Sequence, residues 1–147
     1  MLICFAISDK LRNLLASGKS IICDRYAFSG VAFSAAKGLP LEWCRAPDVS
    51  LPEPDITIFL DVSPDKARER GGYGEERYEN HAMQERVRRI FNEIGEEMSR
   101  SSPLKWVKLS ADDDLDIVSD KIWDAVLPAL EHVEENVGVL WSKQESD

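Results

Sequence analysis

A seven-residue segment in the middle of the chain, Asp55–Asp61, constrains the fold more than any other. It reads Asp-Ile-Thr-Ile-Phe-Leu-Asp, and its apolar residues run almost without interruption. A strand with one face in water alternates apolar and polar residues. A strand of a parallel sheet is covered on both faces, so its residues are apolar almost throughout. Ser63 and Pro64 follow as the N-cap and first position of a helix. The segment therefore predicts a buried parallel strand that leads into a helix.

Strands and helices are expected to alternate along the chain. Further strands are predicted at Ser20–Cys23 and Trp106–Leu109, which are short apolar runs. Four shorter helices are predicted: around Leu11, Leu14 and Leu15 with a stop at Gly18, at Gly30–Lys37, at Leu41–Arg45, and from Pro64 to about Arg70. A longer helix is predicted at Tyr78–Met98, with Val87, Ile90, Phe91 and Ile94 on one face. The last helix is predicted after Asp112–Asp114, with Ile117, Ile122, Val126 and Leu130 on its apolar side. Such alternation predicts an α/β fold with a parallel sheet, and 147 residues suit one domain over residues 1–147.

Charge and cysteine content exclude several classes of protein. The net charge of −9 and the pI near 4.8 argue against a nucleic-acid groove, which needs clustered lysines and arginines. Cys4, Cys23 and Cys44 are widely spaced and form no Cys-x-x-Cys pair, which argues against zinc and for reduced thiols. No apolar stretch approaches the ~20 residues of a membrane span. Met1–Ile7 is apolar but lacks the basic leader of a targeting signal, so we expect it to be a strand or helix of the core.

The segment Gly18-Lys19-Ser20 matches the end of a phosphate-binding loop, Gly-x-x-x-x-Gly-Lys-Ser/Thr. Asn13 stands where the first glycine would be required. Such a loop follows a strand and opens a helix, whereas Lys19 follows a predicted helix and enters a predicted strand. We therefore interpret Gly18 as a helix-terminating glycine and Lys19 as a solvated side chain.

Asp24 and Arg25 directly follow the predicted strand Ser20–Cys23. In open α/β sheets, ligands bind outside the carboxyl ends of the strands. An arginine there can hold a phosphate in a bidentate fork, and an aspartate can hold Mg²⁺ through water. Taken alone, the two residues are as well explained by a salt-bridged pair at a strand end.

The longer string Asp24-Arg25-Tyr26-x-x-Ser29-Gly30-x-Ala32-Phe33 resembles the signature of thymidylate kinases. The similarity covers about residues 15–141, and the chain is identified as a member of that family, of the eukaryotic type. The other matching segments are Trp43-Cys44-x-x-Pro47-Asp48, Leu51-Pro52-x-Pro54-Asp55, the lid-like Arg70-Gly71-x-x-Gly74-x-Glu76-Arg77-Tyr78-Glu79 followed by Gln84, and the closing Leu140-Trp141.

The resemblance implies a P-loop nucleoside monophosphate kinase-like fold, a parallel sheet with helices on both faces. It implies a transferase that moves the ATP γ-phosphate to dTMP and so makes dTDP for dTTP biosynthesis. ATP is then the co-substrate and Mg²⁺ the metal, and no nucleic acid or membrane is a partner. The family also implies a homodimer in the cytoplasm, with nucleus or mitochondrion as other locations.

The resemblance assigns seven residues to the acceptor side of the site, Tyr78 and Gln84 among them. Arg25 would hold the phosphate of dTMP, and Asp24 would lie near Mg²⁺ and the transferring group. Ser29, Gly30 and Phe33 would line the thymine pocket, where glycine lets the backbone approach and Phe33 supplies an apolar wall.

On the nucleotide side, the resemblance makes Arg70 a lid arginine that reaches the phosphates on closure, with glycines beside it as hinges. Asp24, Arg25 and Arg70 are thus the implied catalytic residues. On the acceptor side, Tyr78 would pack near the deoxyribose of dTMP, and Gln84 would support that pocket. The backbone near Ser110, Ala111 and Asp112 would lie against adenine.

The printed sequence departs from the family at its start. Thymidylate kinases begin with a strand and a true P-loop, and that strand is central in their sheet; this sequence shows neither. We therefore expect an incomplete sheet that lacks its central strand, an N-terminally truncated domain, and little or no activity of this polypeptide alone. Met1–Ile7 as a substitute strand is an alternative, and a catalytically inactive dTMP-binding or dimerisation module is the alternative function. A kinase for another nucleoside monophosphate fits less well, because Phe33 and Ser29-Gly30 match the thymidylate pattern.

Overall fold

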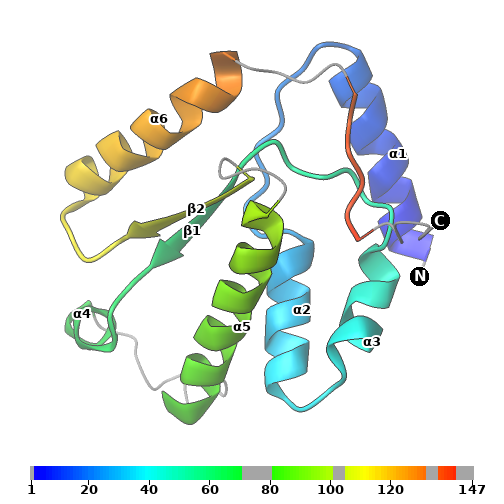
Figure 1. The fold of residues 1–147 in the computed structure, drawn as a ribbon. Coiled ribbons are helices and arrows are strands. Elements are labelled where there is room, and N and C mark those ends of the chain that lie inside the picture. The colour runs from blue at the N-terminus through cyan, green and yellow to red at the C-terminus, as the bar shows by residue number, and fades with distance from the viewer. Residues whose placement is uncertain (1, 71–80, 101–104, 132–135, 142–147) are drawn as a thin grey trace. The chain divides into compact units, whose positions relative to one another are not determined.

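A computed structural model describes residues 2–70, 81–100, 105–131 and 136–141 of the chain (Figure 1). These residues fall into two compact units. The first comprises residues 1–54 and 135–147, and the second comprises residues 55–134. That the chain forms a single domain stays a prediction.

The second unit is built on a pair of parallel strands, β1 (Thr57–Asp61) and β2 (Trp106–Ser110). Their register runs from Thr57 opposite Trp106 to Asp61 opposite Ser110. Figure 1 shows helix α5 (His81–Ser99) on one side of the two strands and helix α6 (Leu115–Glu131) on the other. The prediction of an α/β fold with a parallel sheet between helices is confirmed, with two strands in the described part of the chain.

Three aromatic side chains fill the space between the strands and α5. The rings of Phe59 and Phe91 stack with centroids 4.8 Å apart, and Trp106 lies 6.0 Å from Phe59 and 6.4 Å from Phe91. Gly95 makes this packing possible, because a Cβ at that position would lie 2.4 Å from Nε1 of Trp106. The helix thus approaches β2 at a residue that has no side chain.

Helix α6 buries its predicted apolar side only in part, and Val126 of that side is half-buried. Val118 and Ala129 are buried and Ile122 is half-buried. Ile117 and Leu130, which were expected on the apolar side, are 49% and 51% exposed. The prediction was wrong for these two residues because the helix carries apolar residues on more than one face. The position of β2, which no helical periodicity reveals, decides which face is buried.

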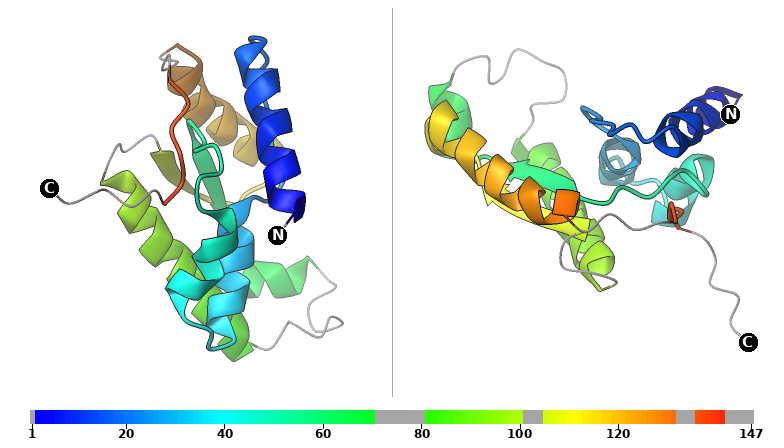
Figure 2. Two further views of the ribbon diagram at one scale, coloured as in Figure 1. Left: turned by 90° about the vertical axis from the view of Figure 1, so that its right-hand side faces the viewer. Right: turned by 90° about the horizontal axis from the view of Figure 1, so that it is seen from above.

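The first unit contains helices α1 (Leu2–Ala16), α2 (Ala27–Ala36) and α3 (Leu41–Arg45), and a 3-10 turn, η1 (Ala46–Asp48). A second segment far along the chain completes it (Figure 2). The amide of Leu140 donates to the carbonyl of Leu51 at 2.9 Å, and the amide of Ser50 donates to the carbonyl of Leu140 at 3.0 Å. Leu140 is buried, so its side chain anchors this C-terminal segment in the unit.

Helix α1 ends as predicted at Gly18, which has a φ of 76°. The amide of Gly18 donates to the carbonyl of Leu15 at 2.8 Å and that of Lys19 to the carbonyl of Leu14 at 3.2 Å, the pattern of a Schellman motif. Gly18-Lys19-Ser20 is therefore a helix terminus and not a phosphate-binding loop. Because Leu2–Ala16 is helical, the alternative that Met1–Ile7 forms a substitute strand is wrong.

The predicted strand at Ser20–Cys23 is absent. These residues belong to no helix or strand, and the side chain of Ile22 is 98% exposed. A strand needs a neighbour for its backbone N–H and C=O groups, and within the described ranges no segment pairs with this one. The apolar run is therefore not sufficient to form a strand by itself. Helix α2, in contrast, begins three residues earlier than predicted, so Ser29 and Gly30 lie inside it.

The close approach at Gly95 gives the first testable prediction. Replacing Gly95 with Ala should lower the free energy of unfolding by about 1–3 kcal/mol, because the new methyl group overlaps the indole of Trp106. Chemical denaturation followed by circular dichroism measures the change. Gly30→Ala is the matched control, because an ideal Cβ there meets nothing within 4 Å. The control should be neutral or more stable by up to about 1 kcal/mol. If Gly95→Ala and Gly30→Ala raised the free energy of unfolding equally, the close contact between Gly95 and Trp106 would be contradicted.

Candidate functional site

The carboxyl ends of β1 and β2 lie at one edge of the second unit and lead into two loops. The amide of Ala111 donates to the carbonyl of Asp61 at 2.9 Å, which extends the parallel pairing past the last residue of β2. Ser110, Ala111 and Asp112, the residues expected against adenine, therefore begin at a strand end. This is the edge where open α/β sheets bind ligands.

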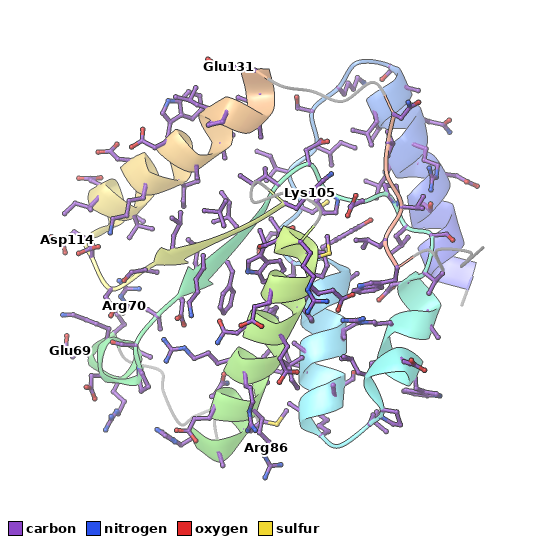
Figure 3. The ribbon with its side chains drawn as sticks, viewed as in Figure 1. Glu69, Arg70, Arg86, Lys105, Asp114 and Glu131 are labelled. Carbon is purple, nitrogen blue, oxygen red and sulfur yellow. The ribbon has the colours of Figure 1, made fainter. Side chains whose placement is uncertain are left out.

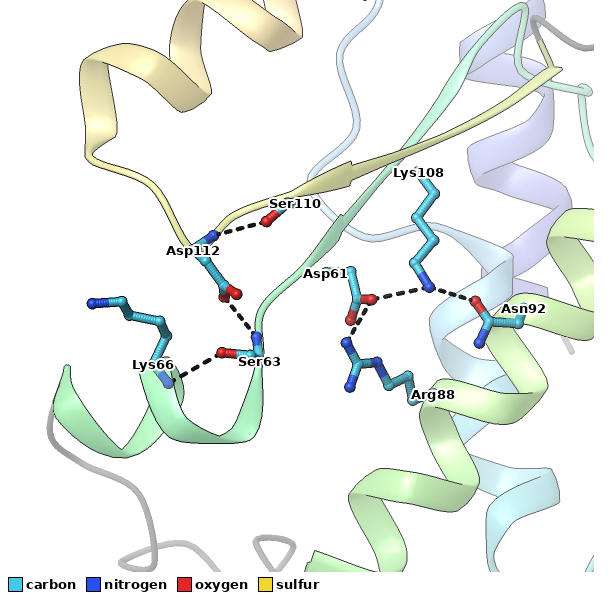
Figure 4. A network of polar contacts seen from close by, with 8 residues as sticks. All are labelled: Asp61, Ser63, Lys66, Arg88, Asn92, Lys108, Ser110 and Asp112. Carbon is cyan, nitrogen blue, oxygen red and sulfur yellow. Dashed lines mark hydrogen bonds and ion pairs between the residues drawn. The ribbon is translucent and has the colours of Figure 1, made fainter.

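The side chain of Asp112 is held by Ser63, the residue directly before the helix that follows β1. One of its carboxylate oxygens accepts a hydrogen bond from the amide of Ser63 at 2.7 Å, and its own amide donates to Oγ of Ser110 at 3.4 Å (Figure 4). Oγ of Ser63 in turn accepts from the amide of Lys66 at 3.3 Å. The prediction that Ser63 caps helix α4 (Pro64–Glu69) is confirmed, and the cap is linked to the β2–α6 loop.

Arg70 holds the same loop from the other end of α4 (Figure 3). Its Nη2 donates to the carbonyls of Ala111, at 2.6 Å, and Asp113, at 3.1 Å. Asp113 also pairs with Lys121 of α6. The structure thus brings together four of the residues expected on the nucleotide side, which are Arg70, Ser110, Ala111 and Asp112.

A charged network beside this edge was missed by sequence reasoning. The carboxylate of Asp61 accepts from Nη2 of Arg88 at 2.7 Å and lies 3.0 Å from Nζ of Lys108 (Figure 4). Lys108 also donates to the side-chain oxygen of Asn92 at 3.0 Å. The register of β2 on β1 places Lys108 on the sheet face that carries Asp61 and meets α5. The only sign of this network in the sequence is an aspartate at the end of a predicted strand.

Two opposing effects set the pKa of Asp61. Burial favours the neutral acid and raises the pKa, whereas hydrogen bonds and charge from Arg88 and Lys108 favour the carboxylate and lower it. The two cations prevail, so the pKa lies below the ordinary value for an aspartate. Asp61 therefore remains ionised, and its charge keeps two basic side chains near the strand end.

In the first unit, Asp24 and Arg25 lie exposed at a bend directly before α2. The backbone of Arg25 has a φ of 65°, in the left-handed region that residues with a side chain rarely adopt. Such a conformation costs on the order of 1–3 kcal/mol and is concentrated at functional sites. Among the described residues other than glycine, Ser50 and Trp141 also have a positive φ.

Tyr26 fastens the segment that follows Arg25. Its hydroxyl donates to the carbonyl of Pro52 at 3.0 Å, and its ring meets that of Phe28 edge-on at 6.3 Å. Burial, then the nearby Cys23 and Asp48, raise the pKa of Tyr26 to about 12, so the phenol remains a donor at neutral pH. Arg25 is consequently next to a fixed point of the backbone.

Ser29, Gly30 and Phe33 follow on one side of α2. Ser29 and Phe33 are half-buried, Gly30 is exposed, and open space surrounds the position of a Cβ at Gly30. Arg25 precedes α2, and the other three residues lie within that helix. Their role on the acceptor side stays a prediction. Gln84 is half-buried in the first turn of α5, and Tyr78 lies outside the described residues.

A magnesium ion would find one acidic residue on the acceptor side. Among the residues that the structure describes, no group of three or more histidine, cysteine, aspartate or glutamate side chains could hold a metal. Mg²⁺ usually keeps several waters and uses one or two carboxylates together with substrate phosphates. The exposed carboxylate of Asp24 fits that mode and does not fit an all-protein metal cage.

Parallel strands between helices are the α/β architecture of P-loop nucleoside monophosphate kinases, and the structure is similar to a solved member of that class. The profile of the family described as thymidylate kinase matches residues 5–122. The chain belongs to the thymidylate kinase family.

Individual relatives agree with this assignment. Thymidylate kinase of Arabidopsis thaliana is 42% identical over 134 residues, which are 90% of this chain and 48% of the relative. The Schizosaccharomyces pombe enzyme is 51% identical, over 74% of this chain and 51% of the relative, and the human enzyme is 39% identical, over 89% and 61%. A solved structure of thymidylate kinase from Candida albicans has a TM-score of 0.76 and 28% identity, covering 92% of this chain and 68% of that one. The chain thus spans about half the length of the curated relatives it matches.

None of the helices in the described ranges is long and apolar enough to cross a membrane.

The network at Asp61 gives a pH-dependent prediction. Its folded pKa lies below the unfolded value, so its contribution to stability is complete above the unfolded pKa near 4 and is lost as the pH falls. Asp61→Asn should lower the free energy of unfolding by about 1–3 kcal/mol at pH 7. The difference from the parent chain should shrink toward pH 3. Denaturant unfolding from pH 3 to pH 7 measures it, with the exposed Asp65→Asn as control. A difference that is independent of pH would contradict the assignment.

Proposed function

We propose that this chain carries the acceptor side of a thymidylate kinase, which transfers the ATP γ-phosphate to dTMP and gives dTDP. The observation that carries the proposal is the strained Arg25 at the exposed bend before α2, beside Asp24 and anchored by Tyr26. A guanidinium with its backbone fixed at a helix start suits bidentate recognition of a phosphate. Family membership supplies the reaction class.

Phosphoryl transfer depends on positioning and on electrostatic stabilisation, so the residues need no enzyme nucleophile. Arg25 binds the phosphate of dTMP, and Ser29, Gly30 and Phe33 orient the thymine along one side of α2. Asp24 would hold Mg²⁺ through water. Bound there, the ion would neutralise charge on the phosphate oxygens.

The nucleotide side lies at the strand ends of the second unit. Ser110, Ala111 and Asp112 contact the adenine of ATP, and Arg70 reaches its phosphates. The guanidinium of Arg70 has five N–H donors, so donors remain beyond the two hydrogen bonds that Nη2 makes to the loop. Tyr78 and Gln84 support the deoxyribose pocket. We propose that the protein works in the cytoplasm, with the nucleus or the mitochondrion as further compartments. We also propose that it forms a homodimer.

The polypeptide of these 147 residues by itself is proposed to bind dTMP without efficient turnover. Its sequence contains no Gly-x-x-x-x-Gly-Lys-Ser/Thr, and the backbone donors of such a loop supply much of the electrostatic stabilisation of the transfer. A catalytically inactive dTMP-binding or dimerisation module is the second candidate function.

Calorimetric titration with dTMP tests the acceptor side. Arg25→Gly should abolish binding or weaken it by tenfold or more, because it removes the guanidinium. The same substitution should not destabilise the fold, because glycine adopts a φ of 65° without strain. Arg89→Gly would disturb α5, so Arg89→Ala, at an exposed helical position, is the matched control and should bind normally. Unchanged affinity in Arg25→Gly would refute the role of Arg25.

A coupled assay of ADP release with ATP, Mg²⁺ and dTMP tests turnover. We expect the purified chain to be at least about 100-fold slower than the ~1–100 s⁻¹ typical of kinases. A rate within that range would show that the chain needs no phosphate loop in its own sequence. Binding of dTMP with negligible turnover would favour the binding module.

A further inference from the structure

The outer face of α6 carries a row of large apolar side chains in water. Trp123, Leu127 and Leu130 lie at spacings of four and three residues, so they share one side of the helix. Trp123 is 58% exposed, and the side chains of Leu127 and Leu130 are exposed as well. The opposite side of the helix, with Val118 and Ala129, is the one that is buried. The apolar row is therefore not needed for the core of this unit.

A row of carboxylates runs beside these apolar residues. Asp116, Asp120 and Asp124 follow each other at four-residue intervals, and Glu131 continues the row to the end of the helix. All four are exposed, and in the described part of the chain none of them forms an ion pair. The nearby Lys121 is paired with Asp113. The face is thus apolar along one line and negative along the next.

The charge decides which occupant fits this face. A second copy of the chain would bring its own carboxylates toward this row, and the whole chain already carries a net charge of −9. An anionic membrane surface would be repelled for the same reason. A helix with apolar anchors and flanking lysines or arginines would satisfy both rows, in the helix-against-helix mode of recognition. From Asp116 to Glu131 the face is about 22 Å long, which matches four turns of such a helix.

We propose that the outer face of α6 is a docking surface for a basic amphipathic helix of another protein. Trp123 is the central anchor, because tryptophans dominate the binding energy of interfaces. Leu127 and Leu130 extend the apolar contact, and the row from Asp116 to Glu131 steers and orients the partner. This surface is separate in its residues from the proposed dTMP and ATP contacts.

Fluorescence anisotropy with a labelled 18-residue helix tests the proposal. The probe has leucines at helical spacing and lysines on both sides, and its comparison peptide has glutamates in place of the lysines. The parent chain should bind the basic peptide, more weakly at high salt, and should not bind the acidic one. Trp123→Ser should raise the Kd about tenfold or more, as should Leu127→Ser, with helix content unchanged in circular dichroism.

A matched control uses the other strongly exposed tryptophan, Trp43 of α3, which is 63% exposed. Trp43→Ser should bind the basic peptide like the parent chain. Replacing Asp116, Asp120 and Asp124 with asparagine should weaken binding and remove most of its salt dependence. Binding that survives Trp123→Ser, equal binding of the acidic peptide or the absence of binding would overturn the proposal. It would also be overturned if Trp123→Ser converted a dimer into a monomer.

Discussion

The parallel pairing of β1 with β2 is the constraint on which the second unit depends. It aligns Asp61 with Ser110, so both strands end at one edge and both following loops start there. The hydrogen bonds of Asp112 to Ser63 and of Arg70 to Ala111 are possible only because those loops are neighbours. A shift of the register by one residue would turn Lys108 away from Asp61 and Phe59 away from Phe91. The register therefore sets both the packing and the polar edge.

The two candidate binding regions, one in each unit, are held by different physical interactions. In the first unit, Arg25 has a strained backbone and is followed by the half-buried Tyr26, whose hydroxyl donates to the carbonyl of Pro52, and by the start of α2. On the nucleotide side, backbone carbonyls and a helix cap hold Arg70 and Asp112 without strain. On the nucleotide side, hydrogen bonds orient the Asp112 carboxylate and the Arg70 guanidinium before any ligand binds, which our proposal requires.

Elements with strong local signals were predictable from the sequence. The uninterrupted apolar run gave β1, Ser63-Pro64 gave the start of α4, and Gly18 gave the end of α1. The same kind of apolar run failed at Ser20–Cys23, because a strand also needs a partner for its backbone groups. The buried face of α6 and the network around Asp61 were not predictable, since each depends on which residues β2 brings into contact.

The sequence by itself determined the alternation of helices and strands, the family, and the identity of the residues at the candidate site. These follow from local periodicity, capping and residue spacing, which one chain carries in linear order. The tertiary structure alone decided that Arg25 has left-handed backbone, that Arg70 holds the β2–α6 loop, and that Trp123 remains in water. Those facts depend on contacts between residues far apart in the chain, and burial and register, not local spacing, set such contacts.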